Sequence, residues 1–260
     1  MSLIHLASRE GSDPTGWVRA PTGITAMERS RAMSVAGGSF YPAMALLLAA
    51  IVLFGFSHTI PFDLAPPGLP LLLVLHALVF GAWVLLFIAQ PALVAGRSIA
   101  MHRRLGWVGV ILACAMILLG GSAILFALRY KTLPPFYPPG LFIVRGLVGL
   151  GLFTGLLASA IVLRRRTEWH KRLMLCAAIT VIGPGLERSL PLPLFGAAWP
   201  FVADGVLDLI ALIGPAIDLL ARSRVHPAYL WGVGAIAAGQ ACVDLVAPTR
   251  IADFLVRLVG

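Results

Sequence analysis

The chain has 260 residues, of which 59% are hydrophobic and only 12% charged, and its formal net charge is +9. Soluble proteins carry about 25% charged residues, so this composition excludes a soluble globular domain as well as a disordered, collagen-like or coiled-coil chain. The chain is therefore expected to fold in lipid, as an all-α polytopic transmembrane helical bundle.

Residues 1–38 are mixed in composition, with Gly, Ser and Pro throughout, and contain no long apolar run. We expect a poorly ordered cytoplasmic tail here. A cleaved signal peptide is excluded because Arg29 and Arg31 precede an apolar run that is too long for the core of such a peptide.

Seven apolar runs follow, each about long enough to cross the roughly 30 Å apolar core of a bilayer as a helix. They cover residues 39–57, 68–93, 102–128, 139–163, 168–187, 200–222 and 227–247. Gly183-Pro184-Gly185 interrupts the fifth run near its end. The runs predict one bundle over residues 39–247, followed by a short C-terminal tail at 248–260.

Lys and Arg are distributed unevenly between the connections. With the N-terminus in the cytoplasm, 14 of the 20 lie on the cytoplasmic side and five on the other, while Arg145 lies within a span. Basic residues prefer cytoplasmic loops, so we expect this orientation in a cytoplasmic (inner) membrane, with anionic lipid head groups as partners. Because the basic residues lie between apolar runs, nucleic acid is not an expected partner.

A short basic segment with a histidine recurs at the inner ends of the spans. The copies are His102–Leu105, His170–Leu173 and, more loosely, Arg224–Pro227. They place His102, His170 and His226 at one depth, where neutral imidazoles suit haem iron or another metal. Histidine flanked by Arg and Lys also suits an interfacial belt that contacts lipid phosphates, and both interpretations stay open.

The second span carries His76, Trp83 and Gln90 at steps of seven residues, which places them on one helix face. A stripe of this kind packs against neighbouring helices through hydrogen bonds. The alternative is that His76 binds haem or lies near a quinone.

Charged residues within the spans predict a buried polar cluster at the outer side. Asp204, Asp208 and Asp218 share one face of the sixth span. Glu187, Arg188 and Arg145 approach the same side, and we expect each arginine to contact one of the acids, with His76 lining the same cavity. The cluster is interpreted either as structural ion pairs or as a substrate, quinone or proton-relay site.

Other chemical signals are weak. Cys114, Cys176 and Cys242 each lie within an apolar run, which argues against disulfides. The sequence contains no HExxH, GxSxG or Walker A motif that would assign an enzymatic activity.

Three segments resemble bacterial polytopic membrane proteins of unknown function: LLLVLHALVFGAWVLLFIAQPALVAGRSIAMHRRLGWVGV, RRRTEWHKRLMLCAAITVIGPGLERSLP and IDLLARSRVHPAYLWG. The likeness covers most of residues 50–235. Those proteins are remotely similar to transmembrane b-type cytochromes of the ascorbate-reducing kind, which hold haem b between four helices. This resemblance implies that His102 and His170 form an inner ligand pair. For an outer pair His76 lacks a partner, because the fourth span carries Arg145 instead of His.

Three classes of function follow. The first is a membrane protein that binds haem or quinone for electron transfer, through His102, His170 and His76. The second is a small-molecule or lipid-handling protein that uses the buried Arg, Asp and Glu cluster. The third is a non-catalytic subunit of a homo- or hetero-oligomeric assembly, indicated by the packing motif Gly151-xxx-Gly155 in the fourth span.

Overall fold

The computed structural model describes residues 27–28, 30, 38–57, 70–133 and 137–259, so most of the expected 1–38 tail lies outside the described residues. Every secondary-structure element in the described part is a helix. The elements are α2 (Phe40–Ser57), α3 (Leu71–Ala95), α4 (Ile99–Arg129), α5 (Pro139–Val162), α6 (Thr167–Val181), α7 (Gly183–Ser189), η2 (Leu192–Ala198), α8 (Trp199–Arg222), α9 (Pro227–Val246) and α10 (Arg250–Val259). The expected all-α bundle is confirmed.

Six of the helices are long and apolar enough to cross a membrane, namely α2, α3, α4, α5, α8 (counted with the end of η2) and α9. The chain is therefore an integral, multi-pass membrane protein. The fifth expected span differs from the others, because it is divided into α6, of 15 residues, and α7, of 7 residues. The division falls where Gly183-Pro184-Gly185 predicts an interruption.

Proline and left-handed residues set the helix boundaries. Pro139, Pro200 and Pro227 stand in the first turns of α5, α8 and α9, where the missing N–H costs nothing. Ser223, with φ 56°, ends α8. The turns after α3 and α4 use Arg97 and Lys131, which also have positive φ.

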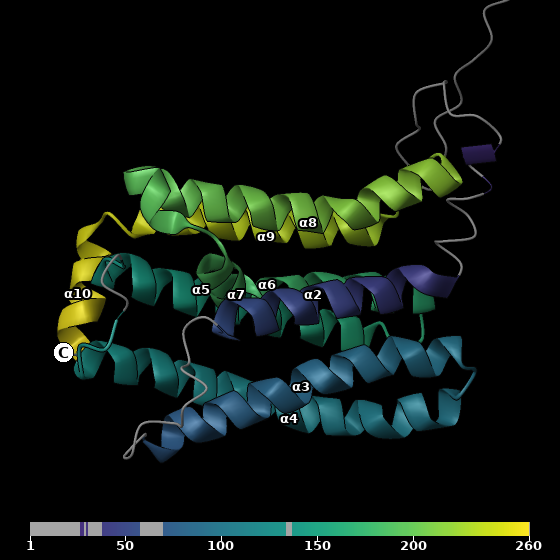
Figure 1. Cartoon of the computed structure of the whole chain (residues 1–260), viewed down its shortest axis with the longest axis horizontal. Helices are drawn as coiled ribbons and strands as arrows, with labels where there is room; N and C mark the ends of the chain where they lie inside the picture. The colour runs from purple at the N-terminus through teal and green to yellow at the C-terminus, as the bar shows by residue number, and fades with distance from the viewer. Residues whose placement is uncertain (1–26, 29, 31–37, 58–69, 134–136, 260) are drawn as a thin grey trace, which may run out of the picture.

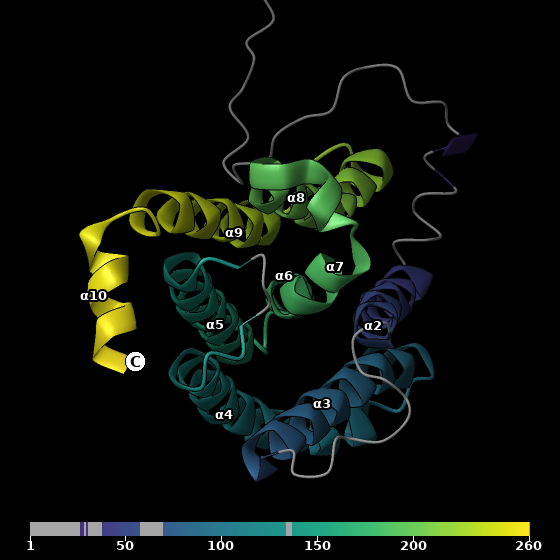
Figure 2. The ribbon, with the colours of Figure 1, turned by 60° about the vertical axis from the view of Figure 1, so that its left-hand side comes forward.

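The long helices run side by side, alternately in opposite directions (Figure 1). We call the end with the connections at 96–98, 163–166 and 223–226 the Arg-rich end. The end with residues 130–133, 137–138 and 189–198 is the opposite end. Helices α2, α3, α4, α5 and α6 pack in sequence around a ring, and α5, α6, α8 and α9 form a second group that shares two of them (Figure 2).

Helix α6 lies at the centre of the molecule and contacts α2, α5, α8 and α9. Its apolar residues from Leu173 to Ile179 are almost all buried. By contrast, Leu71, Leu78 and Leu85 on α3 are exposed, as expected of a helix face in lipid. Because α6 is enclosed by protein, it does not need the length or the apolar surface of a lipid-facing span.

Helices α2 and α7 approach each other closely at two glycines. A Cβ atom at Gly55 on α2 would collide with the carbonyl of Gly185 on α7, so the two backbones are in contact. The motif in the fourth span behaves differently: Gly151 and Gly155 have open space beside them within this chain. They contribute nothing to the packing of the described helices.

Candidate functional site

Arg145 on α5 is the centre of an ion-pair cluster near the opposite end. Its Nε lies 2.9 Å from Glu187 Oε1 on α7. Its two terminal nitrogens donate to both carboxylate oxygens of Asp204 on α8, at 2.5 and 3.2 Å. Bidentate pairing of this kind fixes geometry as well as charge. Three helices are therefore joined through one guanidinium group.

Two aromatic residues contact the cluster. The Tyr137 hydroxyl donates to Glu187 Oε1 at 3.4 Å, and the Arg145 guanidinium lies 6.0 Å from the centre of the Trp199 ring. Burial, followed by the charge of Glu187, raises the pKa of Tyr137 well above its usual value. The phenol consequently keeps its proton and acts as a donor at neutral pH.

The polar residues continue inward between α8 and α9. Gln240 on α9 donates to Asp208 on α8 at 3.0 Å, and Asp244 lies one turn from Gln240. Asp208 and Asp244 both interact electrostatically with the Asp204 carboxylate. We call Arg145, Glu187, Asp204, Asp208, Gln240 and Asp244 the polar track.

The charges of the polar track do not balance. Arg145 neutralises one of the two acids that it contacts, and Arg188 acts on Glu187 from a distance. Within the described part of the chain, Asp208 and Asp244 form no ion pair with Lys or Arg. The polar track thus holds two carboxylates without a basic partner.

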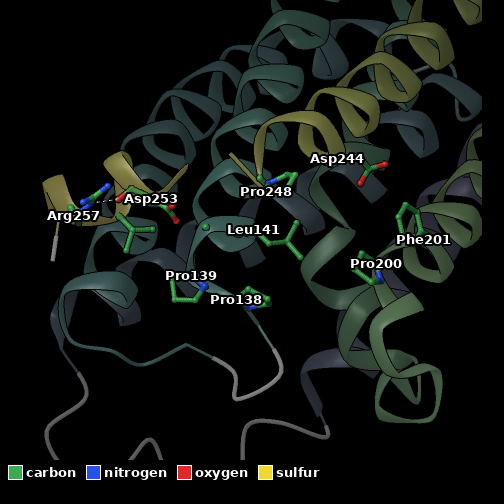
Figure 3. A pocket seen from close by; sticks show the side chains of 12 residues that line it. Pro138, Pro139, Leu141, Pro200, Phe201, Asp244, Pro248, Asp253 and Arg257 are labelled. Atoms are coloured by element: carbon green, nitrogen blue, oxygen red, sulfur yellow. Dashed lines mark hydrogen bonds between the residues drawn. The ribbon is translucent and has the colours of Figure 1, made fainter. Parts of the chain in front are cut away.

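A groove of about 770 Å³ opens at the opposite end, directly outside the polar track (Figure 3). It is lined by Pro138, Pro139, Gly140, Leu141, Pro200, Phe201, Asp244, Ala247, Pro248, Asp253, Val256 and Arg257. Leu141 and Pro200 precede Arg145 and Asp204 by one helical turn, roughly 5 Å. Since Asp244 belongs both to this end groove and to the polar track, the two are continuous.

Three residues expected to join the outer cluster form other contacts. The guanidinium of Arg188 donates to the Pro184 carbonyl at 2.8 Å and lies 4.7 Å from the centre of the Phe56 ring, and it forms no ion pair in the described structure. His76 stacks on Phe80 of its own helix, with ring centres 4.1 Å apart. The third residue, Asp218, is near the Arg-rich end, because it lies fourteen residues beyond Asp204 on α8.

Asp218 belongs to a second ion-pair network, centred on Arg172. Arg172 is only 1% exposed and donates to both carboxylate oxygens of Asp218, at 2.6 and 2.9 Å. It also donates to Glu168 at 2.5 Å, and Arg222 contacts the same carboxylate at 3.1 Å. This network joins α6 to the last turn of α8.

The three histidines of the repeated segment separate into a pair and a single residue. The rings of His102 and His170 have centres 6.4 Å apart. His226 instead stacks edge-on against Trp169 at 5.5 Å, and its Nδ1 accepts a hydrogen bond from Ala228 N–H at 3.1 Å. The described residues contain no group of three or more His, Cys, Asp or Glu able to hold a metal ion, so the expected three-histidine metal set does not assemble.

Each ring of the His102–His170 pair is held through its Nδ1 atom. The Nδ1 of His170 lies 2.9 Å from the Ala160 carbonyl, and that of His102 contacts the side-chain amide of Gln90. Neither Nε2 atom has a hydrogen bond within the described part of the chain. A histidine that binds iron or zinc usually donates its other ring N–H to an acceptor; the Ala160 carbonyl is such an acceptor for His170, whereas the Gln90 amide donates to His102 Nδ1.

Sequence reasoning missed Arg172, Gln240 and Asp244. Arg172 was counted only as a loop charge, although Glu168 precedes it by one turn and is a natural partner. Gln240 and Asp244 are polar residues one turn apart in an apolar run, the same signal that singles out Asp204 and Asp208. Comparisons with family models, with curated proteins and with solved structures find no match for this chain.

Proposed function

We propose that this membrane protein binds a small organic cation, which enters through the end groove and is held by the polar track. The observation that carries this proposal is that Asp208 on α8 and Asp244 on α9 form no ion pair with any Lys or Arg that the structure describes. Asp208 is half-buried and Asp244 is exposed at the end groove, so a ligand that enters the groove can reach Asp244 first. A cation there would gain charge-assisted contacts with these carboxylates.

The lining of the end groove supports an organic cation rather than a bare metal ion. Leu141, Phe201 and Val256, together with several prolines, offer apolar surface around the carboxylates of Asp244 and Asp253, with Arg257 at the α10 side of the groove. Small-molecule sites typically combine an apolar lining with a few placed polar groups. Arg145 acts as a positioning residue, because it holds Glu187 and Asp204 and so shapes the base of the polar track.

Two ions of matched size test this proposal. Purified protein in nanodiscs is titrated with tetraphenylphosphonium and, separately, with tetraphenylborate, and tryptophan fluorescence reports binding. We expect saturable binding of the cation only, weakened about tenfold or more in D244N and D208N, in keeping with charge-assisted contacts of about 1.5–3 kcal/mol. Equal binding of both ions, or unchanged affinity in both variants, would refute the proposal.

We also propose a second candidate function, in which His102 and His170 bind a b-type haem. The separation of the two rings and the contact of His170 Nδ1 with the Ala160 carbonyl support it, since two facing imidazoles are a chemically suitable axial pair. Bound haem would supply one-electron redox chemistry. The chain's own contribution would be ligation from α4 and α6, with Gln90 and the Ala160 carbonyl orienting the rings.

An absorption spectrum tests the haem proposal. Protein produced with added haem precursor should show a Soret band that is lost in H102A and H170A. The matched control is H226A, which removes a histidine of the same repeated segment that lies against Trp169 and away from the pair. Absence of a Soret band, or equal loss in all three variants, would count against haem ligation by this pair.

A further inference from the structure

Helix α10 lies across the bundle instead of along it. In Figures 1 and 2 it runs at a steep angle to the long helices, at the end of the molecule where α4 stops and α5 begins. It packs on both, with Leu128 of α4 and Ile143 and Val144 of α5 in the same apolar cluster as Ala252. Because the ends of membrane spans mark the membrane surface, α10 lies at the depth of the lipid head groups.

Three faces can be distinguished around α10. One is packed against the bundle: Ala252 is fully buried, and a Cβ atom at Gly140 would lie 3.2 Å from its Cβ. The second is polar and carries Arg250, Asp253 and Arg257. The third is apolar and exposed, with Ile251 at 59%, Phe254 at 60% and Leu258 at 71% exposure.

We propose that α10 is an interfacial helix, whose face of Ile251, Phe254 and Leu258 inserts into the lipid of the outer membrane surface while Arg250 and Arg257 contact lipid phosphates. Helices of this type lie in the membrane plane with the apolar side buried at the boundary between head groups and acyl chains. Long arginine side chains reach from such a position to the phosphates. This inference does not depend on the proposed ligand.

A second copy of the chain is the less suitable occupant of this face. Three side chains offer on the order of 500 Å², whereas a stable interface buries about 800 Å² on each partner. The adjacent arginines would also face those of the second copy. Lipid can contact both faces together, because its acyl chains would lie against the apolar face and its phosphates against the arginines.

Single labels on different faces of α10 test the proposal. In a variant with Cys114, Cys176 and Cys242 replaced by Ala, an environment-sensitive fluorophore is attached at F254C, L258C or D253C. The protein is placed in nanodiscs of phosphatidylcholine and phosphatidylglycerol. Quenching by nitroxide-labelled lipid should dominate at positions 254 and 258, and quenching by aqueous iodide should dominate at 253.

Position 253 is the matched control, because it lies on the same helix and faces the end groove instead of the proposed lipid surface. Equal iodide quenching at all three positions would overturn the proposal. So would efficient cross-linking between copies through F254C, which would identify a second chain as the occupant. Should the cysteine-free protein fail to fold, hydrogen exchange of wild-type α10 in nanodiscs and in detergent provides the second measurement: protection only in lipid is expected, and equal exchange would refute insertion.

Discussion

Arg145 and Arg188 lie on helices that meet at the same end of the bundle, yet they have different surroundings. Arg145 contacts two carboxylates, while Arg188 stacks on Phe56 and bonds to a backbone carbonyl of its own helix. In R145M, Glu187 and Asp204 lose their cation, and breaking a buried pair on one side costs about 3–5 kcal/mol. We expect the Tm in detergent to fall by roughly 6–20 °C.

The control for R145M is R188M, which removes an arginine at the same end but no ion pair. Its cost should stay near 1 kcal/mol, the scale of one exposed cation–aromatic contact and one hydrogen bond. A triple variant with Glu187→Gln and Asp204→Asn should recover part of the loss in R145M. Equal Tm values for R145M and R188M would contradict this account of the cluster.

His226 gives the bundle a pH dependence at the Arg-rich end. Burial, and after it the charge of Arg172, lowers the pKa of His226 in the folded protein, whereas the unfolded chain has the ordinary value of about 6.5. Below that pH the unfolded chain takes up a proton more readily than the folded protein. The contribution of neutral His226 to the free energy of unfolding is therefore present above about pH 6.5 and is lost as the pH falls. Protonation of Nδ1 also removes the acceptor for Ala228 N–H.

The variant H226N separates this effect from general acid sensitivity, because Asn caps a helix but does not titrate. Between about pH 7.5 and pH 5.5 we expect the Tm of the wild type to fall further than that of H226N. Parallel curves for the two proteins would show that His226 is not the responsible group.

At the scale of the helices, the approach of α2 to α7 is a point of backbone contact. In G55A the added methyl group meets the Gly185 carbonyl, which cannot move aside as a side chain can. Overpacking of this kind costs about 1–3 kcal/mol. G149A on α5 is the control, since nothing lies beside Gly149. We expect a lower Tm for G55A and little change for G149A; equal Tm values would show that the helices separate freely.

The helices were predictable to within a few residues, because the apolar runs must match the thickness of lipid. The ion-pair partners of the charged residues were less predictable. Helix periodicity places Asp204 and Asp218 on one face, but only depth along α8 decides that Asp218 joins Arg172 at the other end. The burial of Arg172 could not be predicted either, because a single sequence does not indicate that α6 is the helix enclosed by its neighbours. Helix α10 was assigned to a tail because ten residues are too few to span.

At the scale of the whole molecule, the alternation of the helices in Figure 1 places the connections at 96–98 and 247–249 at opposite ends. In the cysteine-free protein, we expect a membrane-impermeant maleimide to label K131C and T249C on intact spheroplasts, and S98C only after lysis, because basic residues are retained in the cytoplasm. Labelling of S98C and T249C on the same side would contradict both the number of crossings and the orientation.

The end groove has walls of two different kinds. Leu141, Phe201 and Asp244 belong to helices that cross the bilayer, whereas Asp253, Val256 and Arg257 belong to α10, which follows α9 after residues 247–249 and packs on α4 and α5. A thicker bilayer changes the tilt of the crossing helices at modest cost, while a helix that lies along the surface follows the surface itself. From the proposed surface position of α10, we therefore expect the width of the groove, and with it access to the polar track, to change with the hydrophobic mismatch between protein and membrane.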